Sequence, residues 1–266
     1  MNTSVVPRPP LAVIQIGSEL ETSLTRGWLT ALAGRFRPYV FTNSVGLELL
    51  GGSVCTLCQA SGGAIALARC GLQLRELNFA PTLALSRGCN SNLLAMLAGN
   101  PVMKAEANDG AMPSQIDASL RRCCAPLGVD SPERSEPIGL TAATTAVATA
   151  MLAEIGYDRR DALTLYAPAS VSLLHDVPRS PLPVVLLPPG AETTALGKMA
   201  GNAYFLPAHD PALRAALIGN AGQLISDDPL SLELAALLRI KSASPQQALE
   251  NTSERRRGFS RDSFLP

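Results

Sequence analysis

The sequence lacks a charge excess of either sign, and this absence narrows the classes of partner. Its 266 residues carry 22 Lys plus Arg and 22 Asp plus Glu, so the formal net charge is zero. Proteins that bind nucleic acid or anionic membranes normally present a long-range positive field. Aromatic residues, on which single-stranded bases stack, make up only 4% of the chain. We therefore expect no nucleic-acid partner and no membrane partner, and a small-molecule ligand fits the composition better.

Long apolar runs and a dense cysteine set are missing as well. No stretch of about 18 uninterrupted apolar residues occurs, so no segment is predicted to span a membrane. The first residues, Met1-Asn2-Thr3-Ser4, lack the basic and apolar regions of a secretory signal. Six cysteines are few for this length, in contrast to the sets that cross-link small secreted domains. These features predict a cytoplasmic protein with reduced thiols.

Short apolar runs alternate with stretches of helical periodicity along most of the chain. Strands are predicted at residues 11–16, 38–42, 81–86, 161–166 and 182–187. Helices are predicted at residues 19–33, 44–50, 60–70, 90–97, 114–124, 141–155, 211–220 and 230–241. Strands separated by helices and short turns indicate βαβ crossovers. The prediction is an α/β fold of three layers, with a mostly parallel sheet flanked by helices.

The domain organisation follows from the same pattern. An apolar fraction of 47% is enough for a sizeable core, so residues 1–241 are predicted to form a single α/β domain. The periodicity weakens between residues 100 and 137, where a lobe boundary would fall, and two similar lobes are the alternative. Residues 242–266 are rich in Ser and Arg and are predicted to be a flexible C-terminal tail.

Turns that follow predicted strands are the first candidates for a binding site, since ligands of parallel sheets bind outside the carboxyl ends of the strands. Gly17 and Ser18 follow the first strand, Asn43 and Ser44 the second, and Ser170 a later one. A helix N-terminus after such a turn offers free N–H groups to an anion. These five residues are candidate substrate contacts. No spaced-glycine nucleotide motif accompanies them, so no cofactor is predicted and plain turns remain the alternative.

The run Cys55-Thr56-Leu57-Cys58 has the C-x-x-C spacing of a redox pair or of half a zinc site. Zinc would need two more ligands, but Cys123 and Cys124 are adjacent, and His175 and His209 are isolated. No metal site is predicted. Buried structural cysteines are the alternative to a redox pair.

Cys89 stands at a predicted strand-to-helix turn, beside Arg87. The helix dipole and the neighbouring guanidinium are expected to lower the pKa of its thiol, which favours a thiolate. A thiolate in this position can act as a nucleophile or as an acid/base.

Residues 83–91, together with the first strand, resemble the aspartate/glutamate racemase superfamily, in which a Cys-Asn-Thr or Cys-Thr turn supplies one of two catalytic cysteines. The resemblance implies Cys89 as the acid/base and Asn90 and Ser91 as substrate ligands, with Asn43 and Ser44 on the preceding turn. The second cysteine turn is absent, because the strand near residue 165 runs into Ala167-Pro168-Ala169-Ser170. Two-base racemisation is thereby excluded, and a one-cysteine proton transfer remains.

The sequence thus predicts a small-molecule-binding α/β protein that works as a cofactor-independent, cysteine-dependent enzyme. A non-catalytic accessory or partner subunit, diverged from an enzyme, is the alternative. Asp210 and Asp228 each precede a predicted helix and are expected to cap it. The alanine-rich helix at residues 141–155 either packs on the sheet or forms a subunit contact, so a homo-oligomer stays open.

Overall fold

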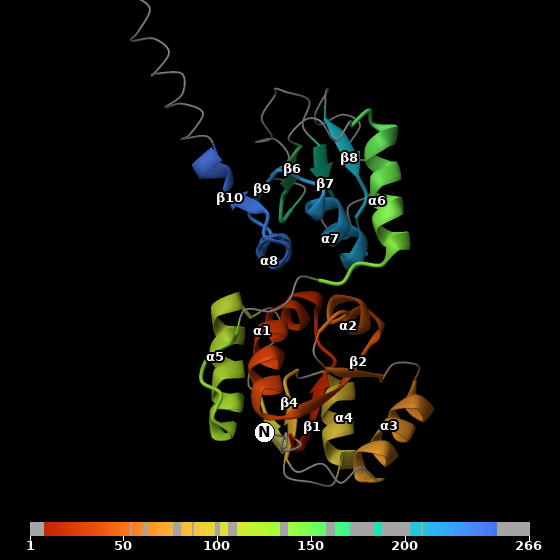
Figure 1. Ribbon diagram of the computed structural model, residues 1–266, viewed down its shortest axis with the longest axis vertical. Helices are drawn as coiled ribbons and strands as arrows, with labels where there is room; N and C mark the ends of the chain where they lie inside the picture. The colour runs from red at the N-terminus through yellow and green to blue at the C-terminus, as the bar shows by residue number, and fades with distance from the viewer. Residues whose placement is uncertain are drawn as a thin grey trace, which may run out of the picture. The chain divides into compact units, whose positions relative to one another are not determined.

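The computed structural model describes residues 8–53, 55–60, 63–76, 81–86, 88–98, 102–105, 111–133, 138–157, 163–170, 184–187, 203–208 and 210–248. The chain divides into two compact units, Met1–Gly139 and Leu140–Pro266. Each unit is described by itself below, with the element labels of Figure 1.

The first unit is built on a sheet of five parallel strands in the order β3-β2-β1-β4-β5. The strands are β1 (Pro10–Gln15), β2 (Arg37–Thr42), β3 (Thr56–Gln59), β4 (Thr82–Ala84) and β5 (Val102–Lys104). The helices are α1 (Glu19–Arg35), α2 (Ser44–Leu49), α3 (Ala64–Glu76), α4 (Cys89–Ala98) and α5 (Pro113–Cys124), followed by the 3₁₀ turn η1 (Ala125–Leu127).

Two helical layers cover the two faces of this sheet, because neighbouring residues of β1 point to opposite sides. Val13 lies in one buried cluster with Trp28 of α1 and Leu120 of α5. Ile14 lies in the other, with residues of α3 and α4 that include Leu94. The first unit is therefore a three-layer sandwich with α1 and α5 on one face and α3 and α4 on the other, as Figure 1 shows.

The direction of winding reverses next to β1. From β1 the chain proceeds outward through β2 to β3, then returns to place β4 on the other side of β1 and β5 beyond it. The connections that follow β1 and β4 therefore lead in opposite directions along the sheet. The carboxyl ends of β1 and β4 form a topological switch point, where ligands of open α/β sheets bind.

The second unit repeats this winding. Its five parallel strands have the order β10-β9-β6-β7-β8, so the chain reverses beside β6 and the switch point lies between β6 and β9. The strands are β6 (Thr164–Ala167), β7 (Val184–Leu186), β8 (Tyr204–Leu206), β9 (Gln223–Ser226) and β10 (Lys241–Ala243), and the helices are α6 (Ala142–Glu154), α7 (Pro211–Gly219) and α8 (Pro229–Leu238). The predicted α/β class with a parallel sheet is confirmed, and the chain forms two similar lobes.

Of the ten strands in the described part of the chain, five were not predicted from the sequence. β3, β5, β8, β9 and β10 are three or four residues long, and four of them mix apolar with polar residues. β10 lies at the start of the stretch predicted to be a flexible tail. Among the helices that the structure describes, none is long and apolar enough to cross a membrane.

A buried arginine holds the second unit together. The Arg214 side chain on α7 is 1% exposed and donates hydrogen bonds from Nε to Ser231 Oγ (2.8 Å) and from a terminal nitrogen to the Leu187 carbonyl (2.9 Å). Its other terminal nitrogen lies 3.3 Å from Asp228 Oδ2, in an ion pair. Asp228 also caps α8 by accepting the Ser231 N–H, as predicted. One guanidinium thus joins α7, α8 and the turn after β7.

Replacement of Arg214 by Met should destabilise the second unit by about 3 kcal/mol, since it removes the cation that pairs with Asp228 and leaves the Leu187 carbonyl without its donor. Arg121→Met is the matched control: Arg121 pairs with Asp117 at 4.0 Å on the surface of α5, and its loss should change stability by less than about 1 kcal/mol.

Urea unfolding followed by circular dichroism would measure both variants. The only tryptophan, Trp28, is buried in the first unit, so its fluorescence reports on that unit alone and should change little in Arg214→Met. Equal effects of the two substitutions would contradict the structural role of Arg214.

Candidate functional site

The switch point of the first unit is closed by a buried serine. Ser86, just after β4, accepts a hydrogen bond on Oγ from the Ile16 N–H (2.7 Å), which ties the end of β4 to the end of β1. The Ser91 hydroxyl on α4 donates to the Ser86 carbonyl at 2.7 Å and lies 3.1 Å from the Ser86 hydroxyl. Ser86 is only 4% exposed. These bonds fix the turn from which the site opens.

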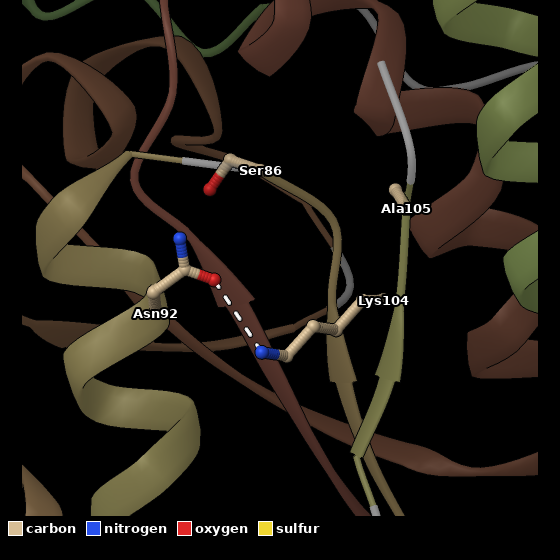
Figure 2. A pocket seen from close by; sticks show the side chains of 4 residues that line it. All are labelled: Ser86, Asn92, Lys104 and Ala105. Carbon is tan, nitrogen blue, oxygen red and sulfur yellow. Dashed lines mark hydrogen bonds between the residues drawn. The ribbon is translucent and has the colours of Figure 1, made fainter. Parts of the chain in front are cut away.

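A hollow of about 330 Å³ lies beside this serine and is lined by Ser86, Asn92, Lys104 and Ala105. Figure 2 shows that the side chains of Asn92 and Lys104 converge from α4 and β5, and that the lysine Nζ donates to Asn92 Oδ1 at 3.5 Å. Among the described residues of this lining, Lys104 alone is charged. An ammonium, an amide and a hydroxyl around one hollow suit an anionic or hydroxyl-rich ligand.

The turn between β1 and α1 brings further polar groups next to Ser86. A Cβ atom placed on Gly17 would stand 3.0 Å from both Gln15 Nε2 and Ser86 Cβ. The same atom would collide with Glu21 Oε2, so the Glu21 carboxylate lies directly over this glycine. Gln15 is fully buried, and its Oε1 has no hydrogen-bond partner among the residues that the structure describes. The turn therefore holds a carboxylate and an amide close to Ser86.

The Glu21 carboxylate also organises the start of α1. Its Oε2 accepts the Ser18 N–H at 2.9 Å, and the Ser18 hydroxyl accepts the Glu21 N–H at 3.3 Å. This reciprocal pair is a capping box, which satisfies two N–H groups at the helix end. The carboxylate is held at the strand edge by the same bonds that start the helix.

The structure brings together most of the predicted site residues at this edge. Gly17 and Ser18 form the turn after β1, and Cys89, Asn90 and Ser91 form the first turn of α4. Cys89 and Asn90 are exposed, whereas Ser91 is fully buried and bonded to Ser86. Ser91 is therefore occupied with positioning the turn.

Asn43 and Ser44 begin α2 at the end of the next strand, β2. The Asn43 carboxamide oxygen accepts the Gly46 N–H at 2.7 Å, so the side chain given as a candidate substrate contact caps the helix. Ser170 lies in the second unit, on the turn after β6. Arg87, His175 and His209 lie outside the described residues.

Sequence reasoning missed Glu21, Asn92 and Lys104. Lys104 ends a strand of only three residues in the stretch where periodicity fades, so nothing local marked it. The S-x-x-E spacing of Ser18 and Glu21 is a recognisable capping box and was the available signal for the carboxylate. Asn92 follows Asn90 by two residues and carried no signal of its own.

The switch point of the second unit has an equivalent serine. The Ser226 hydroxyl at the end of β9 donates to the Ala167 carbonyl at the end of β6, at 2.5 Å. Next to it, Asp227 is exposed, and its Oδ1 accepts the Ala169 N–H at 2.8 Å. This edge therefore presents a carboxylate close to Ser170.

Metal-binding clusters are not found in the described ranges: no three His, Cys, Asp or Glu residues there group around one point. Asp210 caps α7 by accepting the N–H groups of Ala212 (2.7 Å) and Leu213 (3.3 Å), as predicted.

The two thiols of the C-x-x-C run belong to opposite faces of the first sheet. Cys55 packs against the buried cluster of α1 and α5, and Cys58 packs against the cluster of α3 and α4. Burial raises the pKa of Cys55 to about 11, against the smaller lowering by a Ser53 hydrogen bond and the Arg26 charge. Burial likewise raises the pKa of Cys58. The arrangement is that of two structural thiols.

Comparison with known proteins gives matches in structure alone. No protein-family model and no curated protein sequence matches the chain. A glycosyl transferase family 9 protein from Veillonella parvula has a similar structure, with a TM-score of 0.68 and 12% identity over 91% of this chain and 83% of that chain.

Two Escherichia coli structures are similar at lower scores. ADP-heptose LPS heptosyltransferase II gives a TM-score of 0.55 at 13% identity, covering 89% of this chain and 84% of that one. Heptosyltransferase WaaC with ADP-2-deoxy-2-fluoro heptose gives 0.52 at 10% identity, covering 88% of each chain. Identities this low show a shared fold, which is the two-lobed, GT-B-like arrangement of parallel sheets.

The predicted function is corrected by these matches. The chain was expected to be a racemase-like, cysteine-dependent enzyme, but over 91% of its length its fold is similar to that of a glycosyl transferase family 9 protein. The resemblance rested on residues 83–91 and the first strand, which form a strand-to-helix turn that any doubly wound lobe contains. Cys89 opens α4 as a single exposed thiol.

Mild oxidation of the folded protein should not join Cys55 to Cys58, because their thiols lie on opposite faces of the sheet and stay protonated near neutral pH. Mass spectrometry after incubation in a glutathione redox buffer and alkylation would measure this. Cys89, which is exposed, should be modified first and serves as the internal control. An intramolecular Cys55–Cys58 disulfide formed under native conditions would contradict the packing described above.

Proposed function

We propose that this chain binds a nucleotide-activated sugar and transfers its glycosyl group to an acceptor hydroxyl. The observation that carries the proposal is the pair of identically wound parallel lobes, each with its own switch point. The similar structures are glycosyl transferases over nearly the full chain, and one of them is named with an ADP-sugar analogue.

The reaction sets clear chemical requirements. The bond between the anomeric carbon and the phosphate oxygen breaks, and a new bond forms from that carbon to the acceptor oxygen. The nucleoside diphosphate departs with the bonding electron pair, and the acceptor hydroxyl loses its proton. A site for this chemistry needs donors for anionic oxygens and a base for the proton.

The switch point of the first unit offers both kinds of group. Lys104 and Asn92 supply an ammonium and an amide around the hollow, and Ser86 supplies a hydroxyl at its wall. The Glu21 carboxylate stands over Gly17, beside Ser86. We assign Lys104 to an anionic group of a substrate and Glu21 to the acceptor proton. Gly17, Ser18 and Asn90, at the same edge, are proposed substrate contacts.

The switch point of the second unit is the second proposed contact region. Ser170 and Asp227 stand there at the ends of adjacent strands. A carboxylate with one oxygen on a backbone N–H keeps its other oxygen for a ligand, and a carboxylate accepts hydrogen bonds well from sugar hydroxyls. We assign this edge to a hydroxylated part of a substrate.

A panel of nucleotide sugars tests the proposal directly. ADP-, UDP-, GDP- and dTDP-sugars and the matching free diphosphates would each be added while thermal unfolding is followed. A ligand that binds the folded state alone raises the unfolding temperature, and we expect one nucleotide class to do so. No rise with any of them, even at millimolar concentration, would overturn the proposal.

Lys104→Gln should weaken binding of the selected substrate roughly tenfold, because one charge-assisted hydrogen bond is lost while the side chain stays polar. Isothermal titration calorimetry would measure the dissociation constant. Lys241→Gln is the matched control, since Lys241 stands on the edge strand β10 of the second unit, at the amino end of that strand. Equal weakening by both substitutions would argue for a non-specific charge effect.

Glu21→Gln should lower kcat about a hundredfold, because an amide cannot take the acceptor proton. The fold should be retained, since Gln at this position still completes a capping box. Release of nucleoside diphosphate with the acceptor present would report kcat, and thermal unfolding would confirm the fold. Unchanged kcat would remove Glu21 from the proposed chemistry while leaving sugar-nucleotide binding intact.

A further inference from the structure

The first unit carries an apolar outer face that its own core does not use. Four large apolar side chains point to solvent on α3 and α4: Ile65 is 73% exposed, Leu72 58%, Leu93 41% and Met96 75%. The other sides of these helices pack on the sheet through buried residues such as Leu67, Leu74 and Leu94. The four exposed residues are called the α3–α4 face below.

The two helices that make this face are held side by side. Gly71 of α3 allows the close approach, since a Cβ on it would stand only 2.7 Å from the Leu97 Cβ of α4. On each helix the exposed residues follow helical spacing, Ile65 and Leu72 seven apart and Leu93 and Met96 three apart. The spacing places each pair on one side of its own helix, away from the buried residues that pack on the sheet.

Basic side chains frame the α3–α4 face. Arg69 and Arg75 stand three residues before and three residues after Leu72, and both are exposed. Among the residues that the structure describes, neither makes an ion pair. Helix α4 carries no charged residue at all, and Glu76 is the only acid on α3. Among the described residues of the two helices, two arginines therefore stand against one glutamate, and the net charge beside the face is positive.

We propose that the α3–α4 face docks on an anionic lipid bilayer surface. Apolar side chains on one side of a helix enter the boundary between headgroups and acyl chains, and arginines beside them pair with lipid phosphates. The long Arg69 and Arg75 side chains can extend past Leu72 to the headgroup level. This surface is independent of the Lys104 hollow and of the proposed glycosyl transfer.

A second copy of the chain is the less suitable occupant. A twofold contact through this face would bring two pairs of arginines together with only Glu76 of each copy to balance them. A bilayer with anionic lipids supplies the missing negative charge over the whole contact. No membrane partner was expected from the net charge of zero over the entire chain. That sum does not show a positive patch confined to two helices.

Vesicle co-sedimentation of the full chain tests the proposal. Binding should be strong to vesicles of phosphatidylcholine with phosphatidylglycerol, weak to phosphatidylcholine alone, and reduced by added salt. Ile65→Ser with Met96→Ser should lower the partition coefficient at least roughly tenfold, since two large apolar side chains leave the interface. Arg69→Gln with Arg75→Gln should lower it on the order of tenfold for anionic vesicles only.

Matched controls distinguish binding through this face from non-specific adsorption to vesicles. Val147→Ser removes an apolar side chain that is 51% exposed on α6, and Arg121→Gln removes an exposed arginine of α5, on the opposite face of the first sheet. Neither should change partitioning. Absence of wild-type binding to anionic vesicles overturns the proposal. Binding that neither the Ile65 and Met96 substitutions nor the arginine substitutions reduce overturns it as well. A dimer in sedimentation equilibrium that Ile65→Ser with Met96→Ser dissociates, without vesicle binding, would instead assign the face to self-association.

Discussion

The reversal of winding beside the central strand is the constraint on which the rest of the first unit depends. Because β2 and β4 lie on opposite sides of β1, the two crossover connections leave the carboxyl ends of β1 and β4 uncovered. The turns that meet there must still satisfy their backbone groups. Ser86 does so by accepting the Ile16 N–H, and Ser91 in turn holds Ser86. The Gln15 and Glu21 side chains lie at the Gly17 turn beside Ser86, and Lys104 lines the hollow next to Ser86.

The second unit meets the same constraint with the same kind of residue. Ser226 joins the ends of β9 and β6, as Ser86 joins those of β4 and β1. The charged side chains near these serines differ: the first edge carries Lys104 beside a hollow, whereas the second carries Asp227 on an exposed turn. The two edges thus share one winding scheme and differ in the charged side chains that they present.

The sequence predicted the central strands and the helices well, because their signals are strong and local. Residues 11–16 and 38–42 are β-branched or apolar runs bounded by turn residues, and they became β1 and β2. The short strands were not predicted, since segments of three or four residues such as Lys241–Ala243 are too short to show a strand periodicity. Of the proposed site, the turns after long strands indicated Gly17 and Ser18 from the sequence alone. Lys104 depends on pairing between β4 and β5, which no local pattern records. The racemase-like function expected from Cys89 was wrong, because a thiol at a helix start suggests catalysis in any fold.

The Arg214 network has a consequence for the entropy of binding at the second edge. Its guanidinium fastens the Leu187 carbonyl after β7 to the first turn of α8, and Asp228, the residue it pairs with, follows directly on Asp227. The segments at the carboxyl ends of these strands are thus immobilised before any ligand arrives. A ligand that contacts them need not order them first, so less conformational freedom is lost on association.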